Sequence, residues 1–185
     1  MLKITGRNDA RVPKRAVAFL LLLLGALPVT AADASGQASS RNEQTSFGLE
    51  EPVRRPAPIP QDVLRGLGQD ERVQSCLARN GNAAVEIPAS WFVASNIHLN
   101  ADKLPDLIVK PENACLFGAN IGPFWVFRNT GRGYALALRV DTLGLEVLPA
   151  RTRGYRNIRT TAASARQVFT RVFRFNGQSY QGSRR

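Results

Sequence analysis

The residues with the clearest potential for chemistry lie in one short stretch, from His98 to Val109. Oxygen-bearing side chains occur there at Asn100, Asp102 and Asp106, directly before an apolar run. Hard cations such as Ca²⁺ take six to eight oxygen ligands, and a tight loop supplies several of them from alternate positions. The same side chains also stabilise turns by accepting hydrogen bonds from the backbone. The stretch therefore predicts either a hairpin turn held by Asn100 and Asp102 or a weak calcium site formed by Asn100, Asp102 and Asp106.

This spacing resembles the aspartate-rich loop of FG-GAP and VCBS-type repeats, an Asp-x-Asn/Asp-x-Asp-Gly-x-x-Asp pattern followed by an apolar strand. The resemblance covers about a dozen residues and places Asn100, Asp102 and Asp106 on ligand positions. His98 stands where the family carries its first acid. Ala101 and Lys103 replace the usual glycines, so the backbone is less free to turn tightly. The resemblance implies calcium as the one cofactor to test.

The chain contains few of the residues that enzymes commonly use for catalysis. His98 is the single histidine, so any Ser-His or Cys-His mechanism would have to use it. Two widely separated cysteines and one histidine do not form a zinc site. A pair of acids drawn from Asp102, Asp106 and Glu112 would be the minimal hydrolase alternative. The sequence predicts a protein that is not an enzyme.

Basic residues are concentrated in the last part of the chain. From Ala150 to the end there are nine arginines and no acidic residue. This bias predicts either a solvated surface or attraction to polyanions. The predicted anion-binding residues are Arg151, Arg153, Arg156 and Arg159. An exported protein seldom meets nucleic acid, so the expected partner is an envelope component, such as anionic lipid or another acidic polymer.

The first residues have the pattern of a secretory signal peptide. A basic segment precedes an apolar run from Ala16 to about Val29 that is shorter than the roughly 20 residues of a membrane-spanning helix. Small residues follow, and we predict cleavage after Ala31, so that 1–31 is the signal peptide. Its removal leaves 20 basic and 13 acidic residues, a net charge of +7. We predict a periplasmic or secreted protein that is not integral to the membrane.

A single domain is expected over 61–182, after a disordered linker over 32–60 that is rich in Ser, Gln and Pro. Two short amphipathic helices come first, the second one capped by Asp70. About eight short segments rich in aromatic and β-branched residues follow, separated by turn residues. The predicted fold class is α+β, with short N-terminal helices followed by an antiparallel β-meander. Cys76 and Cys115 predict one disulfide in an oxidising compartment, with two buried thiols as the alternative.

The segment from Asn113 to Tyr134 resembles one found in small, uncharacterised exported bacterial proteins, and this resemblance implies no activity. Phe117 and Trp125 within it are either core residues or the lining of a ligand cleft. The sequence therefore predicts a non-enzymatic binding or structural module of the cell envelope. A hydrolase that uses loop carboxylates and a lysozyme-inhibitor-like protein are the alternatives.

Overall fold

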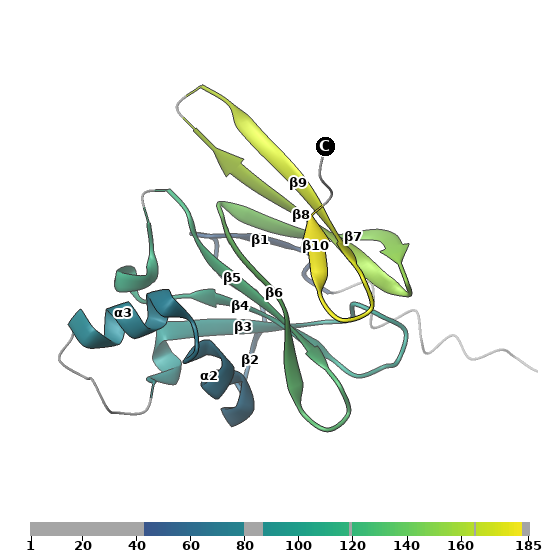
Figure 1. Cartoon of the computed structure of the whole chain (residues 1–185), viewed down its shortest axis with the longest axis horizontal. Coiled ribbons are helices and arrows are strands. Elements are labelled where there is room, and N and C mark those ends of the chain that lie inside the picture. The colour runs from purple at the N-terminus through teal and green to yellow at the C-terminus, as the bar shows by residue number, and fades with distance from the viewer. Residues whose placement is uncertain (1–42, 80–86, 119, 165, 183–185) are drawn as a thin grey trace, which may run out of the picture. The chain divides into compact units, whose positions relative to one another are not determined.

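The computed structural model describes residues 43–79, 87–118, 120–164 and 166–182. These residues all belong to one compact unit, shown in Figure 1. The predicted signal peptide and the first part of the predicted linker lie outside the described residues. No helix of the described part is both long and apolar enough to cross a membrane.

Two antiparallel sheets of five strands each form the framework. The first sheet has the order β1-β7-β8-β9-β10 and consists of Ser46–Gly48, Gly144–Thr152, Tyr155–Ala163, Val168–Phe175 and Tyr180–Gly182. The second sheet has the order β2-β3-β4-β5-β6 and consists of Pro56–Ala57, Phe92–Ile97, Asp106–Pro111, Gly122–Asn129 and Tyr134–Thr142. Helices α2 (Gln61–Leu67) and α3 (Glu71–Arg79) complete the structure with two 3-10 turns, η2 (Ala89–Trp91) and η3 (Ala114–Leu116).

The side chains of β5 connect the three layers of the fold, which are the two sheets and the helices. Phe124 and Val126 point into the core between the two sheets, whereas Trp125 and Phe127 belong to a second core under the helices. Successive side chains of a strand point to opposite faces. The unbroken apolar run of β5 therefore follows from its position as a strand covered on both faces.

The predicted fold class is wrong. Among the described residues 48% lie in strands and 17% are helical, and the strands form two sheets instead of one meander. The chain leaves the second sheet after Thr142 and enters the first at Gly144, with only Leu143 between them. The Thr142 hydroxyl donates to the Thr161 carbonyl at 2.6 Å, and Leu143 N donates to the same oxygen at 2.9 Å. These bonds hold a corner that strand propensity alone does not reveal.

Part of the predicted linker is structured. Residues 43–60 contribute β1 and β2, and Phe47 is buried in the core between the sheets. The buried ammonium of Lys110 donates to the carbonyls of Leu49 at 2.8 Å and Glu51 at 2.5 Å, which fixes the chain after β1. Burial lowers the pKa of Lys110. One phenylalanine and a distant lysine thus order a segment of otherwise linker-like composition.

The predicted disulfide is confirmed. Cys76 on α3 and Cys115 on η3 are bonded, with their Cα atoms 5.8 Å apart and a separation of 39 positions in sequence. The bond ties α3 to the segment that precedes β5. Both elements form walls of the cleft described below.

Candidate functional site

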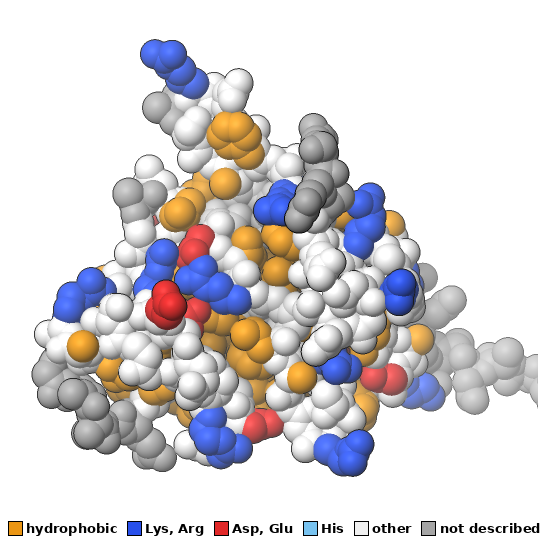
Figure 2. Space-filling model, in the orientation of Figure 1, with side chains coloured by type: hydrophobic (Ala, Val, Ile, Leu, Met, Phe, Trp, Pro, Cys, Tyr) orange, Lys and Arg blue, Asp and Glu red, His pale blue; other side chains and the backbone are white. Residues whose placement is uncertain are grey.

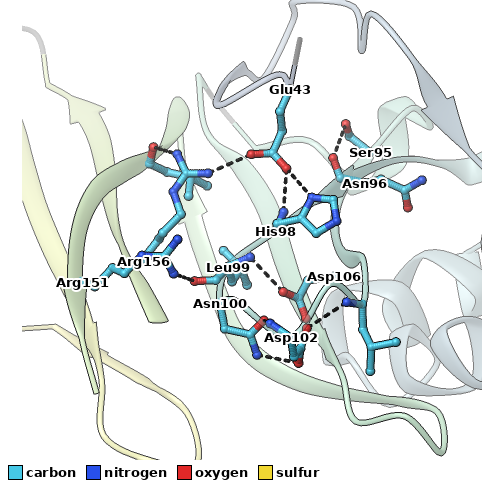
Figure 3. A network of polar contacts seen from close by, with 12 residues as sticks. Glu43, Ser95, Asn96, His98, Leu99, Asn100, Asp102, Asp106, Arg151 and Arg156 are labelled. Atoms are coloured by element: carbon cyan, nitrogen blue, oxygen red, sulfur yellow. Dashed lines mark hydrogen bonds and ion pairs between the residues drawn. The ribbon is translucent and has the colours of Figure 1, made fainter. Parts of the chain in front are cut away.

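Two polar regions of the structure are candidates for function. The first is the β3–β4 turn that carries the predicted calcium ligands (Figure 3). The Asn100 amide donates to Asp102 at 2.6 Å, Asp102 N donates back to Asn100 Oδ1 at 3.2 Å, and the other Asp102 oxygen accepts from Leu104 N at 2.9 Å. Lys103 has a left-handed backbone with φ of 64°. Asn100 and Asp102 therefore brace the turn by the local bonds expected of turn residues.

Asp106 lies under this turn and is fully buried. Its two carboxylate oxygens accept hydrogen bonds from the backbone, one from Leu99 N at 2.9 Å and the other from Asn129 N at 2.7 Å. Burial raises the pKa of Asp106 to about 6, and these two hydrogen bonds act in the opposite direction. Asp106 thus joins the ends of β3 and β5 through their backbones.

His98 belongs to a neighbouring network that crosses between the sheets (Figure 3). The Glu43 carboxylate accepts from His98 N at 2.7 Å and lies 2.9 Å from His98 Nδ1, while its other oxygen pairs with Arg156 at 2.8 Å. Arg156 also donates to the carbonyls of Val147 and Leu148. These contacts connect the segment before β1 to β3 and β8.

These hydrogen bonds bear on the predicted calcium site, because they use the same carboxylate oxygens. All four carboxylate oxygens of Asp102 and Asp106 already accept hydrogen bonds from N–H groups. Among the described residues no three His, Cys, Asp or Glu side chains are grouped closely enough to hold a metal ion. Calcium binding at Asn100, Asp102 and Asp106 stays a prediction, and an ion there would compete with these N–H groups for the same oxygens.

The other predicted site residues are not brought together. Asp106 is the first residue of β4 and Glu112 directly follows this strand, which places them about 20 Å apart along an extended chain. These two acids therefore do not form the pair that the hydrolase alternative requires. Arg151 donates to the carbonyls of Leu99 and Gly154, and Arg159 pairs with Glu146. Of the four predicted anion-binding arginines, Arg156 is held as described above and Arg153 occupies a turn with φ of 51°.

The second region is an open cleft of about 830 Å³ between α3, η3 and β6, which we call the α3–β6 cleft. Figure 2 shows acidic and basic side chains gathered beside exposed hydrophobic surface on this side of the molecule. The cleft is lined chiefly by Asp70, Glu71, Arg72, Ser75, Arg79, Phe117, Trp125, Leu136, Arg139 and Asp141. Sequence reasoning named Phe117 and Trp125 as cleft or core residues, and both line this cleft.

Its inner wall is a chain of alternating charges. Asp70, which caps α3 by accepting from Arg72 N at 2.9 Å, also accepts from Trp125 Nε1 at 3.0 Å and Arg139 Nε at 2.9 Å. Asp141 pairs with Arg139 and lies 3.1 Å from the Arg72 guanidinium. Burial alone would raise the pKa of Asp70, but the bonds from Arg139 and Trp125 outweigh it and lower this pKa. The wall is therefore charged and fixed before any ligand arrives.

A β-bulge brings an apolar side chain to the same wall. The register of β5 and β6 shifts between Val126 and Phe127, where Val126 pairs with Leu138 but Phe127 pairs with Leu136. The extra residue, Ala137, turns into the core between the sheets with Leu138. Leu136 is consequently placed on the cleft face, where it is 46% exposed. Simple alternation along β6 would have put it on the opposite face from Arg139 and Asp141.

Arg79 completes the cleft near the disulfide. Its guanidinium donates to the Cys115 carbonyl at 3.2 Å, and within the described residues no carboxylate pairs with it. Ser75 and Arg79 come from α3, and Phe117 follows η3, so the bond between Cys76 and Cys115 holds both sides in position.

We compared the chain with known proteins in three ways. No family model matches it, and neither a curated protein nor a solved structure is significantly similar to it.

Proposed function

We propose that the protein is an exported, non-catalytic binding module of the cell envelope, and that the α3–β6 cleft is its ligand-binding site. The observation that carries the proposal is the combination, in one open cleft, of a wall of already paired charges, an arginine without a carboxylate partner among the described residues, and an exposed leucine. Ligand sites typically combine apolar lining with a few fixed polar groups. The disulfide is compatible with the oxidising compartment that the N-terminal sequence predicts.

We infer the chemistry of the ligand from the residues that line the cleft. Asp70 and Asp141 pair with arginines of the cleft, and the remaining lining acid, Glu71, lies two helical turns from Arg79 on α3, so the lining has little net charge. Among the described lining residues, Arg79 has the one guanidinium without a carboxylate partner, so it can pair with an incoming carboxylate or phosphate. Phe117 and Leu136 offer apolar surface at the same cleft. The ligand is therefore a small anion that carries an apolar group.

The test is a titration of the chain that begins at Ala32, followed by nuclear magnetic resonance. Phenylacetate serves as the anionic probe, and phenylacetamide is its neutral counterpart of nearly the same shape. We expect phenylacetate to shift the amide signals of Ser75, Arg79 and Phe117 more than phenylacetamide does, since only the carboxylate pairs with Arg79.

Two variants make the result specific. Arg79→Gln should lose the preference for phenylacetate, whereas Arg65→Gln, an exposed arginine on α2 outside the cleft, should retain it. The proposal is wrong if the probes act equally, or if the shifted signals lie elsewhere in the protein. Export is tested separately, by measuring the mass of the chain recovered outside the cytoplasm, which should begin at Ala32.

A further inference from the structure

Strands β8 and β9 extend beyond the rest of their sheet as a two-stranded arm. Their pairing continues to Ala162 opposite Phe169 and Ala163 opposite Val168. On one side β7 pairs with β8 only as far as Thr161, and on the other, among the described residues, β10 pairs only with Phe173–Phe175. In Figure 1 this end of β8 and β9 rises away from both sheets. We call these two outermost residue pairs, together with the described turn residues Ser164, Arg166 and Gln167, the β8–β9 arm.

The end of the arm is apolar on both of its faces. Val168 is 70% exposed and Phe169 is 52% exposed, more than any other large hydrophobic side chain of the described residues. Their cross-strand partners are alanines, whereas the next pair inward is Thr161 and Thr170. Figure 2 shows these hydrophobic side chains on the projecting arm, with a basic side chain at its end. Two successive pairs span about 7 Å, which matches the roughly 5–10 Å to which interfacial segments enter a bilayer.

The charges near the arm differ between its two sides. On the β9 side Arg171 and Arg174 are exposed, and Arg166 is exposed in the turn. Among the described residues none of these three arginines forms an ion pair. On the β8 side Ala163 and Ser164 face a cleft that contains Glu50 and Glu51. The arm therefore presents a basic side and an acidic side, and only the basic side suits a polyanion.

We propose that the β8–β9 arm docks, with its β9 side, on an anionic lipid surface. Arginines near such a surface are attracted to the lipid headgroups, and Val168 and Phe169 enter the interface between them. A second copy of the chain is a poorer occupant, because pairing two β9 edges would bring arginines of like sign together. An acidic polymer without apolar groups would leave both hydrophobic side chains in water. The inference shares with the proposed function only the envelope location, and it uses no residue of the α3–β6 cleft.

Flotation with lipid vesicles tests the inference on the chain that begins at Ala32. Vesicles of equal parts phosphatidylglycerol and phosphatidylcholine should bind the protein at low salt, while pure phosphatidylcholine should not. The double substitution Arg166→Gln and Arg171→Gln should lower the partition coefficient about 25-fold, since each basic residue near an anionic surface contributes about fivefold. Val168→Ser with Phe169→Ser should lower it at least about tenfold by removing the inserted apolar area.

A matched control comes from an exposed hydrophobic residue and an exposed arginine that lie outside the arm. Leu104→Ser with Arg132→Gln changes the same chemistry at turns away from the arm, and it should bind vesicles like the parent. Because the arm residues are exposed, all variants should keep the parental circular dichroism spectrum and melting temperature. Equal binding to neutral vesicles, full binding by the arm variants, or equal loss in the control would overturn the inference. A dimer that disappears in the Val168 and Phe169 variant would assign the arm to a second copy instead.

The two proposals can fail separately. Arg79→Gln should lose its response to phenylacetate and still bind anionic vesicles, whereas the arm variants should show the opposite behaviour.

Discussion

Asp106 in the β3–β4 turn and Asp70 in the α3–β6 cleft are both largely removed from water, and yet their carboxyl groups behave in opposite ways. Asp106 accepts only backbone N–H groups, and burial raises its pKa to about 6. Asp70 is contacted by the guanidinium of Arg139 and by Trp125, and its pKa is lowered. The difference lies in the cationic partner, which offsets the cost of burying a charge.

The same comparison separates structure from function. The turn uses its acids to hold the backbone, and each of their carboxylate oxygens already accepts a hydrogen bond from an N–H group of the chain itself. The cleft pairs Asp70 and Asp141 with arginines and still keeps Arg79 and Leu136 accessible. Aspartates in a sequence suggest a binding site, but whether they can bind a ligand depends on which groups their oxygens already contact. Four predictions test this contrast.

Removing the disulfide should lower the stability of the whole domain by the largest amount, and within the folded state it should disturb the cleft alone. Cys76→Ala with Cys115→Ala opens a loop of 39 positions, for which the loss of chain constraint corresponds to about 3–4 kcal/mol of unfolding free energy. Urea denaturation measures this loss. In nuclear magnetic resonance spectra the amides of Ser75 and Phe117 should shift and broaden, while those of Asp102 and Leu104 keep their positions. Equal perturbation of the turn would contradict the separation of the two regions.

Asp106→Ala should damage the turn and spare the cleft. The change leaves Leu99 N and Asn129 N without acceptors in the interior, at a cost of about 2–4 kcal/mol in unfolding free energy at neutral pH. Asp102→Ala is the matched control, because its bonds are local and exposed, and it should cost less than about 1 kcal/mol. If both substitutions cost the same, Asp106 would not be the residue that holds the turn.

Asp70→Ala should cost about 2 kcal/mol by denaturation, since it removes the cap of α3 and the acceptor of Trp125 Nε1. Asp70→Asn keeps an acceptor oxygen but loses the charge that pairs with Arg139, so its cost should be about half as large. The indole N–H signal of Trp125 should move most in the alanine variant. An unchanged indole signal in both variants would show that Asp70 does not anchor the cleft wall.

The local features of this structure follow from the sequence better than its long-range ones. Three local features depend on residue types that can be recognised in the sequence. They are the turn bonds of Asn100 and Asp102, the helix cap formed by Asp70, and the disulfide. The eight predicted strand segments correspond to β3–β10 in order. Their division into two sheets was missed, because it depends on the corner at Leu143 and on how the strands pair.

The sequence predicts only some of the residues that line the cleft, for a similar reason. Phe117 and Trp125 could be singled out by type, whereas Leu136 reaches the cleft through a bulge at Ala137 that alternation along the strand does not predict. Glu43 and Lys110 likewise act on segments more than 50 positions away. Such contacts order residues 43–60, which have the composition of a linker. Local patterns in a single sequence do not predict features that depend on pairing between distant segments.

The smallest effect is a pH dependence that should have opposite signs at the two acids. Asp106 has a folded-state pKa of about 6, above the ordinary value of about 3.9, so its protonated form favours the fold. This contribution is complete below the unfolded-state pKa and is lost as the pH rises through 6. Between about pH 7.5 and about pH 5, the cost of Asp106→Ala should therefore grow by about 1 kcal/mol.

Asp70 provides the opposing control, because its folded-state pKa is lowered. Its ionised form favours the fold above the unfolded-state pKa, and this contribution is lost as the pH falls through the folded-state pKa. The cost of Asp70→Asn should hence stay constant over the same range and shrink only in stronger acid. Denaturation of the parent and both variants at each pH measures the two slopes. Parallel slopes would mean that the cationic partner of Asp70 does not distinguish the cleft from the turn.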